Sequence, residues 1–190
     1  MKQRARNAFM KANQFNFIAA AFVLLMCFSA NAHEKKWPER RLREAWPAAQ
    51  SFTSKQITLS SAQISDLEKD GVKVDSKDRS PTFYFAQSKE SAPDKPLGII
   101  LFVDTAGANG PMEVSVAMGA DGKVAKVALW EHSENPSVGK DEFLSQFQGK
   151  DASASFTDYK PIAGASKASA AVATATRDAL KISGAVFKKK

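Results

Sequence analysis

The residues best suited to chemistry lie in a short segment, residues 162–169, that leads into an Ala-rich stretch of the chain. Gly164 lets the backbone approach a ligand closely, and Ser166 stands where a helix predicted over residues 167–181 begins. The free N–H groups at a helix N-terminus and the positive end of the helix dipole favour a bound phosphate. For this segment alone, an ordinary Ser-capped helix after a tight turn is the simpler interpretation.

A second segment, residues 131–139, joins a predicted strand to a predicted helix and contains both Pro136 and Gly139. Taken alone, it fits an ordinary connector. His132 within it is more readily explained as a structural residue at a strand end than as a catalytic base.

Several other chemistries are disfavoured. The chain has two histidines, His33 and His132, and one cysteine, Cys27, and no pair of His or carboxylate residues has metal-ligand spacing. It contains neither a G-x-S-x-G elbow nor a Walker loop. The sequence therefore indicates no metal site and no hydrolase machinery.

Residues 1–32 are typical of a secretory signal peptide. They carry four basic residues and no acid, with an apolar run over residues 17–30 and then the small-x-small triplet Ala30-Asn31-Ala32. Because the apolar run is shorter than the roughly 20 residues of a membrane-spanning helix, we expect cleavage after Ala32 and a periplasmic location. A retained N-terminal membrane anchor facing the periplasm is the alternative. Cys27 lies inside this segment, so the mature chain would have no thiol.

The excess of basic residues does not indicate nucleic-acid binding. The formal net charge is +7, and removal of the four basic residues in the first 32 leaves +3, which Lys188, Lys189 and Lys190 account for. No basic stripe interleaved with aromatic residues is present. We interpret residues 188–190 as a basic tail.

The pattern of apolar residues predicts an α+β fold, a single domain after the signal peptide in which helices pack on a mostly antiparallel sheet that forms a meander. Residues 33–81 are interpreted as an N-terminal helical or irregular extension, with a short helix that a Ser60–Gln63 capping box begins and Gly71 ends. Residues 82–187 form the main domain, and Gly184 is expected to end its last helix. The expected strands are residues 82–87, 97–104, 112–118 and 124–131, and the expected helices are residues 140–148 and 167–181.

Four short motifs occur in an order that is typical of one protein family. They are residues 120–123 (Ala-Asp-Gly-Lys, similar to a D-G hairpin), 134–139 (Glu-Asn-Pro-Ser-Val-Gly, similar to E-T-P-G-x-G), 147–150 (Phe-Gln-Gly-Lys, matching F-x-G-K) and 163–169 (Ala-Gly-Ala-Ser-Lys-Ala-Ser, similar to S-G-A-T-x-T-S), with Ala171-Val172 beyond. Over residues 97–180 the chain resembles the FMN-binding domain of periplasmic electron-transfer subunits. Examples are the G subunit of the Rnf complex and the C subunit of sodium-translocating NADH:quinone oxidoreductase.

The resemblance implies a periplasmic electron-transfer module that has FMN as its cofactor and is an electron carrier rather than a self-sufficient enzyme. In this family the Thr of S-G-A-T carries FMN through a phosphoester bond that a periplasmic FAD:protein FMN transferase installs, and Ser166 occupies that position. The redox partner implied is a membrane reductase complex or a periplasmic cytochrome. The residues implied at the FMN site are Ser166, Gly164, Ala165, Lys167, Ser169, Glu134, Asn135, Pro136, Val138 and Gly139.

The chain departs from the family pattern at several positions. Ala163 and Ala168 replace Ser or Thr residues, Ser166 replaces the acceptor Thr, and Lys160 stands where the family usually has Asp. These departures keep an alternative open, in which the chain is a degenerate member of the family that binds no flavin and acts as an adaptor or assembly protein.

Overall fold

The computed structural model describes residues 37–89 and 95–187. The predicted signal peptide, residues 1–32, and the predicted basic tail, residues 188–190, lie outside the described residues. Contacts divide the chain into two units, Met1–Pro38 and Glu39–Lys190, and the elements below belong to the second unit. No helix in the described part of the chain is long and apolar enough to cross a membrane.

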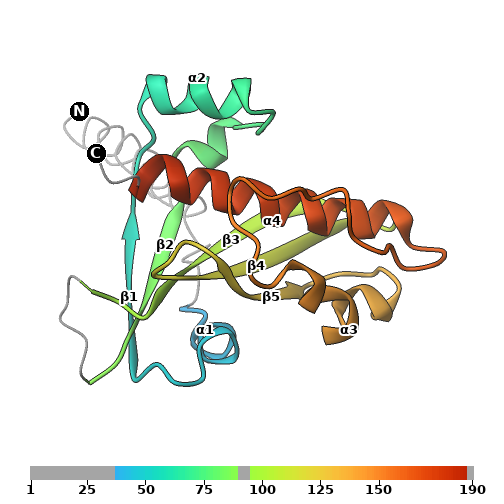
Figure 1. The fold of residues 1–190 in the computed structure, drawn as a ribbon, viewed down its shortest axis with the longest axis horizontal. Helices are drawn as coiled ribbons and strands as arrows, with labels where there is room; N and C mark the ends of the chain where they lie inside the picture. The colour runs from blue at the N-terminus through green and yellow to red at the C-terminus, as the bar shows by residue number, and fades with distance from the viewer. Residues whose placement is uncertain (1–36, 90–94, 188–190) are drawn as a thin grey trace, which may run out of the picture. The chain divides into compact units, whose positions relative to one another are not determined.

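A five-stranded antiparallel sheet forms the centre of this unit, with the strands in the order β1-β2-β3-β4-β5 (Figure 1). Because each strand lies beside the next strand in the sequence, the sheet is a meander, and the predicted α+β class is confirmed. The strands are β1 (Ser51–Gln56), β2 (Thr82–Gln87), β3 (Gly98–Ala106), β4 (Pro111–Gly119) and β5 (Val124–Trp130).

Strands β2 to β5 lie within a few residues of their predicted positions, because local signals define them. In the turn between β4 and β5, Gly122 has a φ of 79°, and the Lys123 N–H donates to the Asp121 carboxylate at 3.1 Å. Gly adopts such a conformation without strain. The apolar run of β3 predicts burial on both faces of the sheet, and its neighbouring residues Ile100 and Leu101 are both buried.

Helix α4 (Ser166–Phe187) packs along one face of the sheet, where it contacts β3, β4 and β5 (Figure 1). Burial of its apolar stripe fixes its position, since apolar surface removed from water is the main force in packing. The predicted stripe is buried as expected, and alternate residues of β4 face it in the same core: Val172, Ala175, Ala179 and Leu180 from the helix, and Met112, Val114, Val116 and Met118 from the strand.

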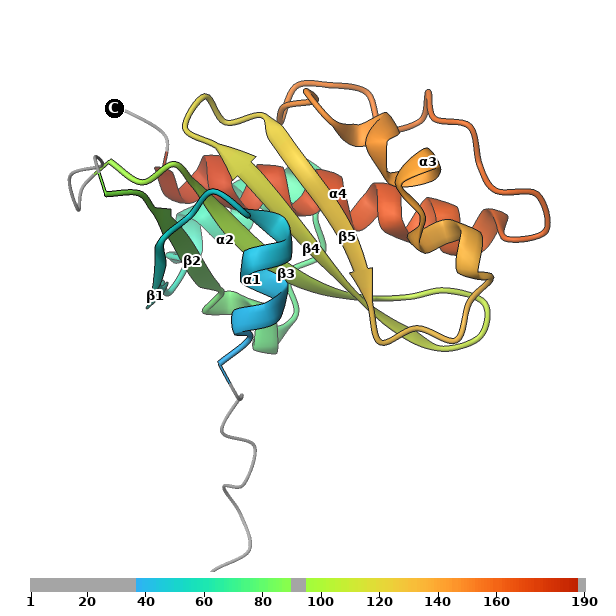
Figure 2. The ribbon, with the colours of Figure 1, turned by 90° about the horizontal axis from the view of Figure 1, so that it is seen from below.

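Helix α1 (Glu39–Ala45) covers part of the opposite face of the sheet, as Figure 2 shows. Leu42 is fully buried there, in a second and smaller core that also contains Tyr84, Ile100 and Ala117. The central strands are therefore enclosed by helices on both faces, which explains why β3 is a nearly continuous apolar run.

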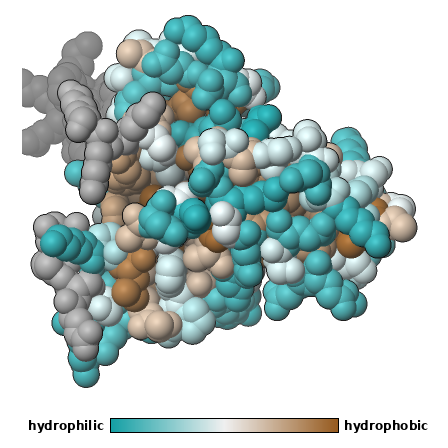
Figure 3. All heavy atoms as spheres, in the orientation of Figure 1, coloured by the Kyte–Doolittle hydropathy of each residue, from teal (hydrophilic) through white to brown (hydrophobic). Residues whose placement is uncertain are grey.

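Helix α2 (Ser61–Lys69) begins with the predicted capping box. The Ser60 Oγ accepts the Gln63 N–H at 3.3 Å, and the Gln63 side chain accepts the Ser60 N–H at 2.9 Å. Leu67 is its buried residue, and Figure 3 shows that the outer surface of α2 is largely hydrophilic. A 3-10 helix, η1 (Ser76–Arg79), leads from here to β2.

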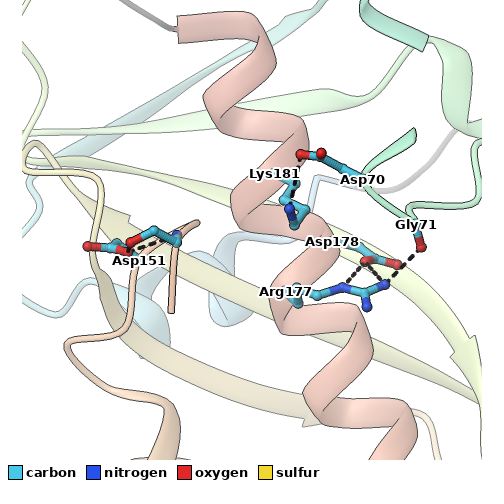
Figure 4. Close-up of polar contacts among 7 residues, drawn as sticks. Asp70, Gly71, Asp151, Arg177, Asp178 and Lys181 are labelled. Atoms are coloured by element: carbon cyan, nitrogen blue, oxygen red, sulfur yellow. Dashed lines mark hydrogen bonds and ion pairs between the residues drawn. The ribbon is translucent and has the colours of Figure 1, made fainter. Parts of the chain in front are cut away.

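Polar contacts attach the end of α2 to α4 (Figure 4). Arg177 Nη2 donates to the Gly71 carbonyl at 3.0 Å and to the Asp178 carboxylate at 2.7 Å, and Lys181 Nζ pairs with Asp70 at 3.0 Å. Burial raises the pKa of the Asp178 carboxyl above its usual value, although Arg177 opposes this shift. The segment between β1 and β2 is thereby attached to the helix that begins at Ser166.

Two features differ from the sequence predictions. Strand β1 lies within residues 33–81, which were predicted to be helical or irregular. The prediction missed this strand because its exposed polar sequence shows no apolar alternation, and its pairing with β2 defines it. Gly184 does not end the last helix: α4 continues to Phe187, whose ring packs edge-on against Phe83 with 4.9 Å between centroids. Packing of the last turn outweighs the weak helix propensity of Gly.

Two glycine variants test where these helices end. Gly184→Ala should raise the free energy of unfolding by about 0.5–1 kcal/mol, because an added Cβ inside the helix meets no atom within 4 Å. Gly71→Ala should lower it by about 1 kcal/mol, because Gly71 has a φ of 77°. Urea unfolding measures both changes, and a destabilising Gly184→Ala would contradict a helix that runs through to Phe187.

Candidate functional site

Helix α4 begins directly after a tight turn. Gly164 has a φ of 73°, which suits Gly, and the Ala165 N–H donates to the Ile162 carbonyl at 3.0 Å. The Ala165 carbonyl accepts the first helical hydrogen bond, from the Ser169 N–H at 2.9 Å. Ala165 therefore holds the capping position, and Ser166 is the first residue inside the helix. The interpretation of Ser166 as an ordinary helix cap is wrong for this reason.

The first turn of α4 presents backbone donors that are not otherwise used. Within the described residues, the N–H groups of Ser166, Lys167 and Ala168 have no acceptor, and the Ser166 hydroxyl has no hydrogen-bond partner. Ser166 and Lys167 are exposed, whereas Ala168 is fully buried. A Cβ added to Gly164 would meet no atom within 4 Å. Free donors, the positive end of the dipole and a nearby ammonium group together fit a phosphate group.

Ser169 has a supporting role within this site. It is fully buried, and its Oγ accepts the Ile162 N–H at 3.0 Å and donates to the Ala165 carbonyl at 2.9 Å. Both hydrogen bonds stabilise the turn that presents Gly164 and Ser166. The motif implied that Ser169 binds the cofactor, but its hydroxyl faces the turn rather than the solvent.

Residues 131–139 form the second part of the candidate site and end in a 3-10 helix, η2 (Pro136–Gly139). The Asn135 side chain begins η2 by accepting the Ser137 N–H at 2.9 Å. Val138 is fully buried and anchors the loop in the main core, whereas Asn135 and Pro136 are exposed. Asn135 and Pro136 are therefore available to a ligand, and Val138 holds them in place.

Glu134 differs from the other residues of this loop because its carboxylate is buried. Only 7% of the residue is exposed, and Oε1 accepts the Asn109 N–H at 2.5 Å. A Cβ added to Gly107 in the same turn would overlap this oxygen, so the close approach requires Gly at that position. The motif implied that Glu134 binds the cofactor, whereas the structure uses its carboxylate to attach the loop to the turn between β3 and β4.

Gly139 allows His132 to pack closely against the end of the loop. A Cβ added to Gly139 would lie 3.3 Å from His132 Nε2. His132 Nδ1 is buried and has no hydrogen-bond partner among the described residues. These contacts favour the structural interpretation of His132 over a role as a base.

The side chains of Gln146 and Lys150 fix the segment before α4 through contacts that the sequence did not indicate. Gln146 Oε1 accepts the Lys160 N–H at 2.7 Å, and its Nε2 donates to the Lys160 carbonyl at 3.2 Å. Lys150, the last residue of the F-x-G-K motif, donates to the Ser155 carbonyl at 2.8 Å and to Asp158 at 2.7 Å. The hydrogen bond from Lys150 holds the pKa of the Asp158 carboxyl below its usual value. Local patterns do not indicate these contacts, because the partners are 14 and 8 residues apart.

Packing brings the two predicted segments to the same end of the domain. The helix predicted over residues 140–148 is present as α3 (Asp141–Leu144) followed by a 3-10 turn, η3 (Ser145–Phe147). Phe143 and Phe147 from this region, Val138 from the loop and Ala165 from the turn before α4 belong to one buried core. Figures 1 and 2 both show the N-terminal end of α4 at the same end of the domain as α3.

Comparison with known proteins agrees with the motifs. Residues 107–181 match the model of the FMN-binding domain family. This segment contains both parts of the candidate site, and the match agrees with the family that the motifs indicated and supports FMN as the cofactor. Among solved structures, the crystal structure of the C subunit of the Na⁺-translocating NADH-quinone reductase from Parabacteroides distasonis is similar, with 14% identity, a TM-score of 0.49 and coverage of 80% of this chain and 83% of that chain. No curated protein sequence matches the chain.

A matched pair of glutamine variants tests how the segment before α4 is held. Gln146→Leu removes both hydrogen bonds to the Lys160 backbone and should lower the free energy of unfolding by about 1 kcal/mol. Gln148→Leu, at an exposed position nearby, should change it by less than about 0.5 kcal/mol. Equal effects of the two substitutions in urea unfolding would show that Gln146 does not hold this segment.

Proposed function

We propose that the chain is a periplasmic electron-transfer protein that carries FMN through a phosphoester bond to Ser166. The observation that best supports this proposal is the start of α4. An exposed hydroxyl without a hydrogen-bond partner lies beside the backbone N–H groups of two exposed residues, Ser166 and Lys167, which have no acceptor within the described residues. A helix N-terminus of this kind stabilises the negative charge of a phosphate group.

Each residue at this helix end has a distinct task. The N–H groups of the exposed residues Ser166 and Lys167 would hold the phosphate, and the Lys167 ammonium supplies a counter-charge. Attachment would replace the hydroxyl proton of Ser166 with the FMN phosphoryl group of FAD, with cleavage of the FAD pyrophosphate bond and release of AMP. Gly164 keeps the approach open, because no side chain projects from it. FMN, when bound, supplies the redox chemistry, and the protein supplies anchoring and orientation.

The loop that contains Asn135 and Pro136 would border the ring system of the cofactor. Both residues are exposed, and the buried Val138 anchors them in the core that also holds Ala165. Rigid placement of this loop limits the rearrangement that electron transfer would otherwise require. The loop would thus contact the ring system of FMN, and the start of α4 would bind its phosphate.

Location and partners complete the proposal. Residues 1–32 have the pattern of a signal peptide, and the remaining chain has no cysteine, which suits an oxidising compartment. A periplasmic FAD:protein FMN transferase would attach the cofactor, and the exposed position of Ser166 supports access by such an enzyme. Electrons would then pass to or from a membrane reductase complex or a periplasmic cytochrome.

Three serine variants test the attachment site. The full chain is co-expressed with an FMN transferase in a periplasm, denatured, and examined by visible absorbance and intact mass. The wild type and Ser166→Thr should stay yellow and gain the mass of one FMN group, because both residues offer a hydroxyl to the phosphate. Ser166→Ala should lose both signals. Ser169→Ala should keep the covalent flavin, because its hydroxyl is not the acceptor, and should lose about 1–3 kcal/mol of stability, because the partly buried Ile162 N–H loses its acceptor.

Two outcomes would overturn the proposal. Flavin that stays on denatured Ser166→Ala would place the attachment elsewhere. A colourless wild-type chain of unmodified mass, with no change on titration with free FMN, would favour the flavin-free adaptor that the departures at Lys160, Ala163 and Ala168 suggest.

A further inference from the structure

The loop of the candidate site leaves the sheet through a residue with an unfavourable backbone conformation. Glu131 directly follows β5 and has a φ of 49°, the one positive φ at a non-glycine residue in the described part of the chain. Residues that bear a side chain rarely adopt this region, and they keep it where surrounding contacts hold them. The direction in which residues 132–139 leave the sheet depends on this conformation.

Arg41 of α1 supplies such a contact from 90 residues away. Its guanidinium pairs with the Glu131 carboxylate through Nη2 and with the Glu113 carboxylate of β4 through Nη1. The same group lies 5.2 Å from the centroid of the Trp130 ring, and the Trp130 Nε1–H donates to Ser115 Oγ at 2.9 Å. Two carboxylates and one aromatic face therefore fix the guanidinium, a geometry that the planar fork of Arg suits and that Lys does not reproduce.

Asn109 holds the same loop from a second side. Its backbone N–H donates to the buried Glu134 carboxylate at 2.5 Å, and its Nδ2 donates to the Ser133 carbonyl at 3.1 Å. Arg41 thus fixes the first residue of the loop, and Asn109 fixes the residues just before Asn135. The exposed residues of the candidate flavin site follow directly after these two points of attachment.

We infer that Arg41 and Asn109 are positioning residues of the flavin site, and that α1 is part of this site although it lies outside the segment that matches the FMN-binding domain family. They act through residues 131–135, which set the place of Asn135 and Pro136 before any ligand binds. A loop held in advance loses less conformational freedom on binding. The inference rests on the proposed function in so far as the ligand of the loop is a flavin.

Docking of α1 on the sheet does not depend on Arg41. Leu42 is fully buried in the smaller core, and Ala45 is also buried there. Loss of the guanidinium should therefore leave α1 in place, release Glu131, and remove one partner from Glu113 and from the Trp130 ring. Arg40 is the matched control, because it lies on the same helix, its side chain is 80% exposed, and its ion pair is with Glu44 of the same helix. Its guanidinium also lies 5.9 Å from the centroid of the Trp130 ring, so the comparison isolates the two ion pairs that Arg41 alone makes with Glu113 and Glu131.

The test compares Arg41→Met, Arg41→Lys and Arg40→Met in the full chain. In the flavin-free protein, Arg41→Met should speed amide hydrogen exchange of residues 132–139 by about three- to tenfold, with no such change in Arg40→Met. Arg41→Lys should fall between them, because one ammonium cannot hold both carboxylates. In the flavin-loaded protein, Arg41→Met should change the visible circular dichroism of the flavin and its midpoint potential, whereas Arg40→Met should keep the wild-type values.

The two readouts separate the possible failures. Equal exchange in Arg41→Met and Arg40→Met would overturn the inference that Arg41 orders the loop. Faster exchange with an unchanged flavin spectrum and potential would show a merely structural role and overturn the inference about the flavin. A wild-type chain that takes no flavin would contradict the proposed function and the flavin half of the inference, and hydrogen exchange would still decide whether Arg41 orders the loop.

Discussion

Burial of α4 against the sheet is the constraint on which the rest of the structure depends. The helix packs its small and branched apolar residues against β3, β4 and β5 over nearly its whole length, from Ala168 to Ile182. A helix held in this way cannot tilt or slide without exposing apolar surface. Its N-terminus therefore projects from the domain at a fixed place, and the three N–H groups without acceptors point in a fixed direction. The contacts of Arg177 and Lys181 with the end of α2 add to this rigidity.

Around this helix end, buried polar residues shape the backbone and exposed residues remain free for a ligand. Ser169 and Gln146 use their hydrogen bonds to hold the turn and the segment before it. Glu134 does the same for the loop after β5 through the Asn109 N–H. Ser166 and Asn135 take no part in these hydrogen bonds, and both residues are exposed. Short sequence motifs thus contain two kinds of residue, and only burial and hydrogen bonding distinguish a supporting residue from one that can reach a cofactor.

Much of the fold follows from local sequence signals, and the remainder does not. Neighbouring residues specify the Asp121-Gly122 turn, the apolar alternation of β4 and the capping box at Ser60. The meander and α2 were therefore predictable. Strand β1 has no such local pattern. Its pairing with β2 defines it, and that pairing could not be predicted from neighbouring residues. Gly184 resembles a helix end locally, but contacts of the last turn extend α4. For the candidate site, the motifs indicated both segments, whereas the contact between Arg41 and Glu131 joins residues 90 positions apart and could not be read from the sequence.

The phosphate site at the start of α4 can be tested directly by amide NMR of the unmodified mature chain during titration with FMN. We expect the largest shifts of the N–H resonances at Ser166 and Lys167, because a phosphate would accept their hydrogen bonds, with a second group of shifts in residues 135–139. The amide of Ser169, which already donates to Ala165, should move much less. Shifts confined to other parts of the chain, or no shifts at all, would contradict a phosphate site at this helix end.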